Sequence, residues 1–546
     1  MYKLSSELLR GAVVLTATAV SVLSFRLPAR SLMMSTASEV SSAAPPSWAI
    51  LQQQLRSMGR DFEAQKEAIE SGDFGAHTDA KVRLFGHRPE DVRVTFYRDT
   101  AAWCPYCQKT WLLLEEKRIP FRVEKINMRS YGAKPKEFLE KVPNGLLPAM
   151  ELDGKLMTDS QRIMVTLENV FDGPEYDPEG YLTLPTIRKD AALMSRAEEL
   201  LRLERELFSA WCQWCFRPDF GDMNKRNFEE VLGRVDAALG DLPGPFFMGE
   251  EMSIVDLVYV SHVERQVSSL LYWKGYQIRS HRGAEDERYP NINVWFDAFE
   301  TRENGAYMAT KSDHFTHVKD IPPQYGPSFF TADFSTEFGQ RMIGAIDGGV
   351  DRDAAAASKG AIDGKGILGS LLGQLGDGRS AAPTEPEGGV PPDWRLPLPP
   401  IAEAPVVVLP PNDPGEAESR MLGAERLIFN HEAVVRFALR GAGEPGRPSY
   451  SAPLADPNAV PSDDPTLKQV VDELLRSVAA KMVLGENPEQ LSPTLDTAPE
   501  LGIPAAQCLD YLRSRVGVPR DMIYPAARQF RAHLAWAMEQ AAHKAM

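Results

Sequence analysis

Residues 92–114 read VRVTFYRDTAAWCPYCQKTWLLL, and this stretch decides the fold of the first half of the chain. Apolar side chains alternate with polar ones from Val92 to Phe96, which is the pattern of a half-buried β-strand. Helical spacing of apolar residues takes over from Trp111 to Leu114. The motif Cys104-Pro105-Tyr106-Cys107 is therefore predicted to lie in a tight turn between a strand and the start of a helix.

This position favours the thiolate form of the first cysteine of the motif. Cys104 lies where unpaired backbone N–H groups and the helix dipole favour an anion, so we expect its thiolate to be populated near neutral pH. Pro105 suits the first helical position, and Cys107, one turn later, is placed to capture a mixed disulfide. A zinc knuckle and two buried thiols are the alternatives. Zinc needs two further ligands, and no paired Cys or His motif at finger spacing follows, so the context favours redox chemistry.

After the motif, predicted elements follow in the order strand, helix, strand, strand, helix. They lie at Phe121–Val123, Pro135–Lys141, Leu147–Leu152 and Lys155–Met157, with the last helix opening at Asp159-Ser160. Asp153-Gly154 is typical of a tight hairpin between the last two strands. Together with the strand and helix around the cysteines, this βαβ then ββα order predicts an α/β thioredoxin-like domain over residues 90–175.

With these motifs, the chain resembles the cysteine-type glutathione transferases, namely the omega, lambda and dehydroascorbate reductase classes. Its Cys-Pro-Tyr-Cys motif also resembles that of dithiol glutaredoxins. The resemblance covers about residues 90–320. It implies that residues 90–175 bind glutathione as a co-substrate, that no metal takes part, and that an all-α transferase domain follows at 185–325. A homodimer is compatible with it.

The resemblance also implies a glutathione site. In that family the residue before a cis-proline pairs by its backbone with the cysteinyl part of glutathione, and Leu147 and Pro148 match these places. An acidic residue followed by serine holds the γ-glutamyl end, and Asp159 and Ser160 match that pair. A carboxylate accepts from the ligand ammonium while the serine hydroxyl and helix-start N–H groups bind its carboxylate; ordinary helix capping is the alternative. Lys134 resembles the omega-class lysine that neutralises the glycine carboxylate, with a solvated loop lysine as the alternative.

Residues 185–325 carry helical patterns that agree with this second domain. A long apolar pattern runs from Leu193 to Trp211, and Pro290–Thr301 predicts a later helix. Ser253-Ile254-Val255-Asp256 has the form of a capping box at the start of another helix. Trp211-Cys212-Gln213-Trp214-Cys215 holds a second cysteine pair inside a continuous helix. We interpret these thiols as helix packing, with a place in the wall of an acceptor pocket as the alternative.

The composition sets further limits. The chain has 546 residues, 43% of them hydrophobic, which is enough for two or three domains. The net charge is −16, and no basic run interleaved with aromatic residues occurs, which argues against nucleic acid as a partner. Four of the five cysteines form two close pairs rather than a disulfide framework, which suits a reducing compartment.

Residues 1–46 differ from the rest in carrying four basic and two acidic side chains with abundant Ser and Ala. An apolar stretch from Gly11 to Phe25 follows a charged start, as in a signal peptide, and is short for a membrane span. Phe25–Arg30 then has arginines and no acids, and the whole resembles the bipartite leaders of algal secondary plastids. We therefore expect a plastid targeting segment and no stable membrane association after processing. A mitochondrial location and a retained anchor are the alternatives.

The remaining segments are predicted from composition and periodicity. Residues 47–89 are expected to form an N-terminal extension, 343–414 a linker rich in Pro, Gly and Ala, and 415–546 a helical module of unknown role. Helical patterns in that module lie at Glu416–Leu439, after Asp464-Pro465, and at Pro525–Ala542.

Three basic side chains occur in the last of these patterns. They are Arg528, Arg531 and His533. We interpret them as solvated charges on the polar side of a helix, with anion binding as a remote alternative.

Together these features predict a glutathione-dependent thioltransferase or reductase with Cys104 as the nucleophile. Its thiolate attacks a glutathione mixed disulfide or an oxidised acceptor such as dehydroascorbate, and a second glutathione or Cys107 then resolves the adduct. The choice between a one-thiol and a two-thiol mechanism stays open. The competing hypothesis is a binding or scaffold protein that keeps the transferase fold to recognise a thiol adduct or a protein partner.

Overall fold

The computed structural model describes residues 44–285, 287–326, 328, 416–446, 456–485 and 490–545. The predicted linker 343–414 lies outside the described residues, as does the predicted targeting segment except for residues 44–46. In the part of the chain that is described, no helix has the length and apolar character needed to cross a bilayer.

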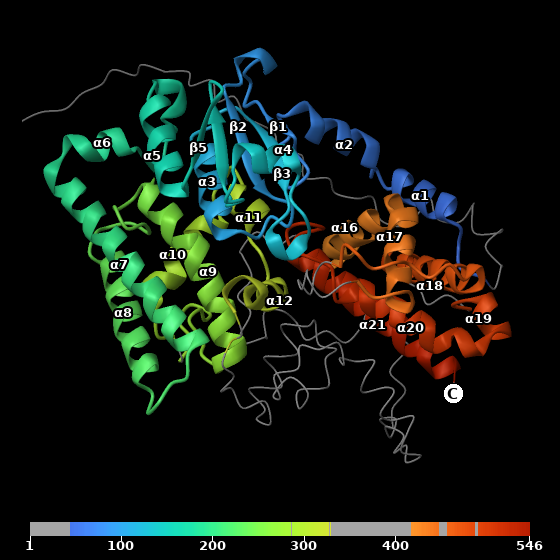
Figure 1. Cartoon of the computed structure of the whole chain (residues 1–546). Coiled ribbons are helices and arrows are strands. Elements are labelled where there is room, and N and C mark those ends of the chain that lie inside the picture. Colours follow the sequence, from blue (N-terminus) through green and yellow to red (C-terminus); the bar gives the residue numbers. More distant parts are fainter. Residues whose placement is uncertain are drawn as a thin grey trace, which may run out of the picture. The chain divides into compact units, whose positions relative to one another are not determined.

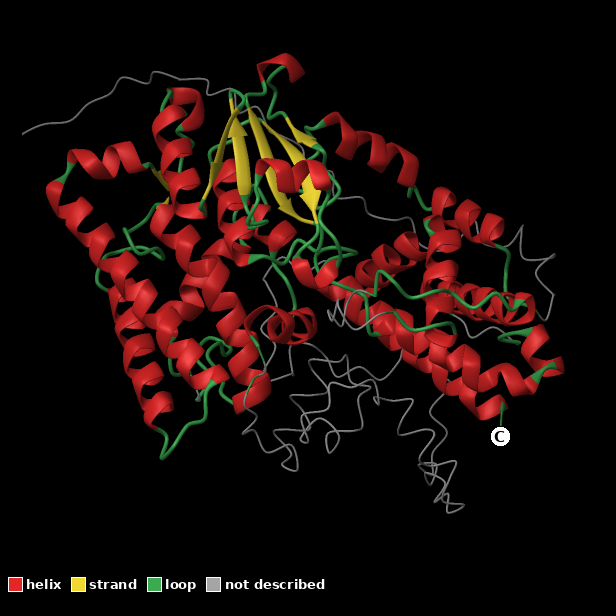
Figure 2. Ribbon diagram, in the orientation of Figure 1, coloured by secondary structure: helices red, strands yellow, loops and turns green. Residues whose placement is uncertain are grey.

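A five-stranded mixed sheet organises the first domain (Figure 2). Its strands are β1 (Val82–Arg83), β2 (Val94–Asp99), β3 (Phe121–Ile126), β4 (Ala149–Leu152) and β5 (Lys155–Thr158). Their order across the sheet is β1-β3-β2-β4-β5. Strands β2 and β3 are parallel and are joined by the crossover helix α3 (Pro105–Glu116), whereas β4 is antiparallel to both β2 and β5. The predicted thioredoxin-like order is confirmed.

Two further helices complete this domain. They are α4 (Lys136–Lys141) and α5 (Ser160–Val170). Phe96 of β2, Leu112 of α3 and Ile163 of α5 are fully buried in one apolar cluster. The alternation along β2 therefore places its inward side chains against helices on the sheet, and the carboxyl end of β2 leads directly into the cysteine motif.

An all-helical region follows, as the sequence predicts. Its helices are α6 (Leu184–Lys189), α7 (Ala191–Phe216), α8 (Met223–Gly240), α9 (Ile254–Lys274), α10 (Pro290–Glu300), α11 (Ala306–Thr310) and α12 (His314–Tyr325). The short strands β6 (Tyr181–Leu182) and β7 (Met252–Ser253) pair in parallel at its edge. The predicted capping box opens α9: Ser253 Oγ accepts from Val255 N, and the Asp256 carboxylate accepts from Ser253 N. Almost all of α9 is buried, so it is the central helix of this region.

A second group of helices forms the C-terminal module. They are α16 (Glu416–Phe429), α17 (His431–Ala438), α18 (Pro465–Leu484), α19 (Pro493–Thr497), α20 (Gly502–Arg513) and α21 (Tyr524–Lys544). The pattern predicted as one helix over Glu416–Leu439 is broken at Asn430, between α16 and α17.

The segment predicted as an N-terminal extension contains α1 (Trp48–Ser57) and α2 (Phe62–Ser71) (Figure 1). Leu51 and Leu55 of α1 are fully buried in the apolar cluster of the C-terminal module. Trp48 Nε1 donates to the Asp472 carboxylate of α18 at 2.8 Å. Segments more than 400 residues apart in the sequence therefore share one core.

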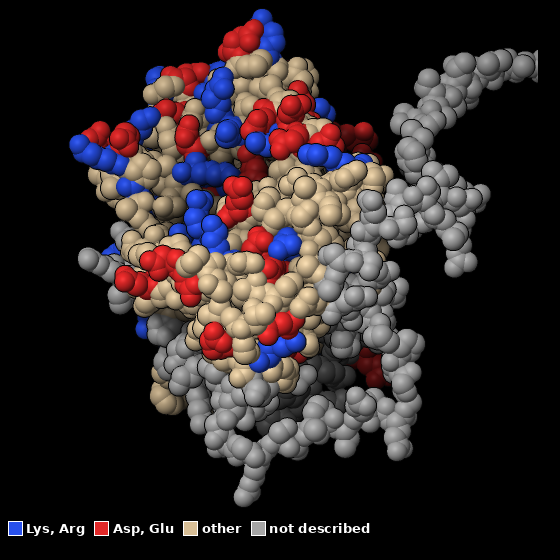
Figure 3. Space-filling model, turned by 90° about the vertical axis from the view of Figure 1, so that its right-hand side faces the viewer, with Lys and Arg blue, Asp and Glu red and all other residues tan. Residues whose placement is uncertain are grey.

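The interpretation of Arg528, Arg531 and His533 as solvated charges is wrong. Their exposed fractions are 3%, 1% and 0%. Helix α21 is buried on most of its faces against α16, α18 and α20, so its charged side chains lie inside the protein. Arg531 forms an ion pair with Asp313, at the start of α12, at 2.6 Å. The charges on the surface face drawn in Figure 3 are instead of both signs and intermixed.

Candidate active site

Cys104 occupies the place that the sequence predicts for it. It is the N-cap residue of α3, and Pro105 is the first residue of the helix. The carboxylate of Asp99, at the end of β2, accepts hydrogen bonds from Trp103 N at 2.7 Å and Cys104 N at 3.2 Å. These bonds tie the turn to the sheet and fix the position from which α3 begins. The Cys104 side chain is 9% exposed, so only a small part of it meets solvent.

The two thiols and Asp99 form a compact buried group. The Cys104 and Cys107 sulfurs and a carboxylate oxygen of Asp99 all lie within 4.8 Å of one another. Burial, followed by a hydrogen bond to Cys104, raises the pKa of Cys107 well above its usual range. Cys107 is therefore the protonated partner of the pair and can donate to the sulfur of Cys104. Structural zinc takes four protein ligands, and the described part of the chain brings three metal-binding side chains together here.

The sequence motifs did not identify Asp99 as a residue of the site. Its Oδ2 holds the turn, while its Oδ1 is buried and has no hydrogen-bond partner among the described residues. A carboxylate directly after a buried strand and five residues before a cysteine motif was the available signal, because it lies at the same sheet edge as the thiols.

Two lysines carry positive charge toward the thiols. Lys134 donates to the backbone carbonyl of Asn127; burial lowers its pKa, and the nearby Cys107 and Cys104 oppose that shift. Lys109, on α3, is 4% exposed, and burial lowers its pKa to about 8.

Lys109 was not predicted from the sequence. The charges that oppose its pKa shift include those of Glu204, Asp159 and Cys104, so its amine lies among groups of both domains. A buried lysine with a strongly shifted pKa next to a nucleophile is a candidate functional group. The signal in the sequence was a lysine five residues after Cys104, within the helix that the cysteine motif begins.

The expected backbone feature at Leu147-Pro148 is present. The peptide bond between these residues is cis, and Pro148 is buried. Strand β4 begins at the next residue, Ala149, which pairs with Tyr97 of β2. Since Tyr97 precedes Asp99 by two residues in an antiparallel pairing, Leu147 and Pro148 lie beside the end of β2 that carries the cysteine turn.

Asp159 and Ser160 open α5 as predicted. Asp159 is the N-cap, and its carboxylate accepts from Arg162 N at 2.9 Å, so the capping interpretation describes one of its roles. Its backbone has φ 74° and ψ 110°, a conformation that costs a non-glycine residue roughly 1–3 kcal/mol. Ser160 is buried at the first helical position. Such strained positions cluster at ligand sites, and Asp159 is also an electrostatic neighbour of Lys109.

Helix α9 of the helical domain packs against the cysteine motif. His262 of α9 packs edge-on against Tyr106 of the motif, with ring centroids 5.3 Å apart. Its Nδ1 lies 2.7 Å from Glu204 Oε1, and its Nε2 is buried with no hydrogen-bond partner in the described part of the chain. Burial lowers the pKa of His262 to about 4, so the imidazole is neutral at physiological pH. Tyr325, at the end of α12, also lies near Tyr106 and Cys104.

The second cysteine pair differs from the first. Cys212 and Cys215 lie inside α7, as predicted, and not at a helix start. Burial raises the pKa of Cys212 to about 11 and that of Cys215 to about 12. Neither is poised to ionise near neutral pH, which agrees with packing. Cys212 is nevertheless only partly buried and is an electrostatic neighbour of Tyr106, so a place in the pocket wall stays open.

Comparisons with known proteins agree with this geometry. Residues 103–170 match the family model described as glutathione S-transferase, N-terminal domain. Over these residues the chain is similar to the glutathione S-transferase N-terminal domain. The match begins at Trp103 and therefore includes the cysteine motif, the cis-proline turn and most of α5.

Three curated relatives, all from Arabidopsis thaliana, align with about a third to two fifths of the chain. Glutathione S-transferase DHAR2 is 27% identical over 180 residues, which are 33% of this chain and 75% of the relative. Glutathione S-transferase L3 is 27% identical over 216 residues, or 39% of this chain and 81% of the relative. Chloroplastic glutathione S-transferase DHAR3 is 26% identical over 175 residues, or 32% of this chain and 59% of the relative. The transferase likeness therefore accounts for about two fifths of the chain.

Proposed function

We propose that this protein is a glutathione-dependent thiol oxidoreductase that reduces a glutathionylated or oxidised acceptor through Cys104. One observation carries the proposal: the first cysteine of the pair is the N-cap residue of a helix, while burial, followed by a hydrogen bond to that cysteine, raises the pKa of the second. The relatives named dehydroascorbate reductase and lambda-type transferase support the same assignment.

The reaction with a mixed disulfide is a thiol exchange. The Cys104 thiolate attacks the glutathione sulfur of an R–S–S–glutathione substrate, the substrate S–S bond breaks, and the acceptor thiolate leaves and takes a proton from water. A glutathione thiolate then attacks the Cys104–glutathione disulfide, which gives oxidised glutathione and regenerates Cys104. In a two-thiol cycle, Cys107 instead attacks the Cys104–glutathione disulfide, which releases glutathione and leaves a Cys104–Cys107 disulfide. Two further glutathione molecules then reduce that disulfide and are released as oxidised glutathione.

The surrounding residues fit the binding of glutathione. Leu147 and Pro148 are proposed to pair with its cysteinyl backbone beside the end of β2. Asp159 and Ser160 are proposed to hold the γ-glutamyl end at the start of α5, where backbone N–H groups favour a carboxylate. Lys134 is proposed to neutralise the glycine carboxylate. Lys109 adds a buried positive charge near Cys104 and Asp159.

The proposal is tested with the intact protein and its Cys104→Ser and Cys107→Ser variants, using a glutathione mixed disulfide and dehydroascorbate as separate substrates. We expect Cys104→Ser to abolish turnover of both, because it removes the nucleophile. Full loss with Cys107→Ser as well would indicate a two-thiol cycle, and retained activity a one-thiol cycle. Absence of turnover in all three proteins, with glutathione still bound in calorimetry, would favour the binding-protein alternative and refute the enzyme.

The composition of residues 1–46 supports plastid targeting as part of this proposal, as does the chloroplastic relative. A fusion of these residues to a fluorescent protein tests the location, with mitochondrial fluorescence as the contrary result.

A further inference from the structure

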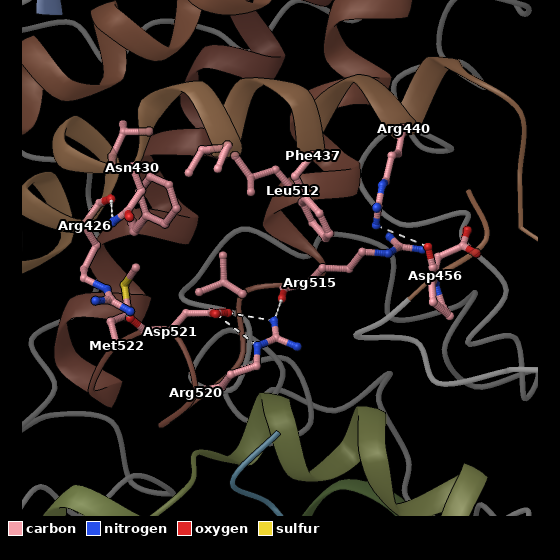
Figure 4. Close-up of a pocket in the computed structure, with 16 residues that line it drawn as sticks. Arg426, Asn430, Phe437, Arg440, Asp456, Leu512, Arg515, Arg520, Asp521 and Met522 are labelled. Atoms are coloured by element: carbon pink, nitrogen blue, oxygen red, sulfur yellow. Dashed lines mark hydrogen bonds and ion pairs between the residues drawn. The ribbon is translucent and has the colours of Figure 1, made fainter. Parts of the chain in front are cut away.

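The C-terminal module encloses a cavity of about 480 Å³, within the range of roughly 300–1,000 Å³ that is typical of small-molecule sites (Figure 4). It is lined by α16, α17, α20, the loop before α21, and α21 itself. Its apolar wall includes Leu427, Val434, Phe437, Leu512, Met522 and Phe530. Nothing in the proposed transferase reaction uses this cavity.

Four arginines and two aspartates also line the cavity, which leaves an excess of positive charge in a protein whose net charge is −16. Two of the arginines are neutralised. Arg426 pairs with Asp79 at 3.2 Å, and Arg520 pairs with the cavity residue Asp521 at 2.7 Å.

The other two arginines, Arg440 and Arg515, form no ion pair with any carboxylate of the described residues. Arg440 donates to the backbone carbonyl of Asp456 at 3.3 Å. Arg515 donates to Tyr511 O at 3.3 Å and to Ser514 Oγ at 2.9 Å. The hydrogen bonds of both guanidinium groups therefore go to neutral oxygens, and Asp456 and Asp510 act on Arg515 only through their charge. Hydrogen bonds to charged groups contribute more than those between neutral groups.

The two guanidinium groups are also held in place. The central carbon of Arg515 lies 3.6 Å from the Tyr511 ring centroid, and that of Arg440 lies 5.0 Å from the Phe437 ring centroid. Both arginines interact electrostatically with Tyr511, so they belong to the same end of the cavity (Figure 4). The Nε atom of Arg515 is buried and lacks a hydrogen-bond partner within the described residues. A buried donor without a partner is costly unless a ligand satisfies it.

We propose that this cavity binds a small organic anion, a carboxylate or sulfonate joined to a compact aromatic or branched apolar body. The acid group pairs with Arg440 and Arg515, whose planar forks match carboxylate and sulfonate oxygens. The apolar body packs against Phe437 and Leu512. Binding satisfies the Arg515 donor and places a negative charge beside two guanidinium groups that form no ion pair within the described residues.

A pair of matched dyes tests this proposal on the full-length protein. 8-Anilinonaphthalene-1-sulfonate carries the anion, and N-phenyl-1-naphthylamine has the same aromatic body without it. We expect fluorescence titration to show one site for the sulfonate dye. The neutral dye should bind there with a dissociation constant at least about tenfold higher. Arg515→Gln should weaken the sulfonate dye by a similar factor and leave the neutral dye nearly unchanged, because only the charge interaction is removed.

A second variant keeps the test decisive if Arg515→Gln does not fold. Ala433 lines the cavity and is otherwise exposed on α17, so Ala433→Trp fills the space without disturbing a core position. It should abolish the same dye site. Arg436→Gln, an exposed arginine on the same helix outside the cavity, is the control and should bind the dye as the parent does. Sulfonate-dye binding that is equal in the parent and in Ala433→Trp would overturn the proposal.

Discussion

At the scale of single residues, the difference between the two motif cysteines carries the proposed chemistry. Cys107 is buried and protonated, and it is a hydrogen-bond partner of Cys104. Cys104 itself is the N-cap residue of the helix. The pair is thus asymmetric before any substrate arrives. Lys109 adds a buried positive charge that is neutralised by no ion pair within the described residues. Its environment lowers stability and is expected to favour binding of an anion.

Replacing Lys109 is predicted to raise stability and to weaken glutathione binding. Its pKa is about 8 in the folded protein, below the ordinary value near 10.4, because burial disfavours the charged form. The unfolded chain therefore binds more protons between pH 8 and 10, so this residue lowers stability below pH 8. We expect Lys109→Met to raise the free energy of unfolding at pH 7 by roughly 3 kcal/mol in urea titrations.

The same variant should lose glutathione affinity. We expect KM for glutathione to rise about tenfold at pH 7 in Lys109→Met. In the parent protein KM should rise as the pH passes 8 and Lys109 loses its charge, whereas the variant should show no such step. Lys136→Met, at an exposed lysine of α4, is the control. A variant that is more stable but has unchanged KM would assign Lys109 no part in binding.

At the scale of elements, the end of α12 packs beside the cysteine turn. Its last residue, Tyr325, packs on Trp103, the residue before Cys104, with ring centroids 6.5 Å apart. It also stacks on Phe216 and contacts Trp211, both in α7. Tyr325 therefore connects the cysteine turn to α7, and Cys104 beside it is 9% exposed.

Removing the Tyr325 ring should make the Cys104 thiol more accessible to reagents. We expect Tyr325→Ala to increase the rate of Cys104 alkylation by iodoacetamide several-fold, because the ring near the thiol is removed. Peptide mass spectrometry measures the rate, and Cys508, buried in α20, serves as the control within the same molecule. Equal Cys104 rates in the two proteins would show that α12 does not limit access.

At the scale of the whole molecule, the C-terminal module contacts the start of α12. Val518 N donates to Thr316 Oγ1 at 3.0 Å, and Ser312 Oγ donates to Val518 O. The ion pair between Arg531 and Asp313 is 1% exposed on both sides. Burial alone would raise the pKa of Asp313, but the charge of Arg531 and its hydrogen bond lower it overall.

Breaking that ion pair should destabilise the protein strongly. We expect Arg531→Met to lower the free energy of unfolding by about 3–5 kcal/mol at pH 7, since the Asp313 carboxylate is left buried and unpaired. A double variant that also carries Asp313→Leu should recover much of the loss. Urea midpoints of the three proteins measure the effect. A loss below about 1 kcal/mol would place this pair in the class of exposed salt bridges.

The sequence by itself determined the local elements of this protein. The alternation before the cysteines, the proline after Cys104, the Asp153-Gly154 hairpin and the capping box at Ser253 each depend on neighbours within a few residues, so they are legible in a short window. The order of those elements then indicated the thioredoxin-like domain, and the motifs predicted a site around Cys104.

Only the tertiary structure decided which charged groups are buried and what they meet. Lys109 and Asp99 are buried because separate elements pack around them. Arg531 is buried because other helices enclose α21. The cavity lined by Arg440 and Arg515 likewise arises from four separate segments. Burial depends on which distant segment covers a side chain, and long-range contacts of this kind leave no periodic pattern in the sequence.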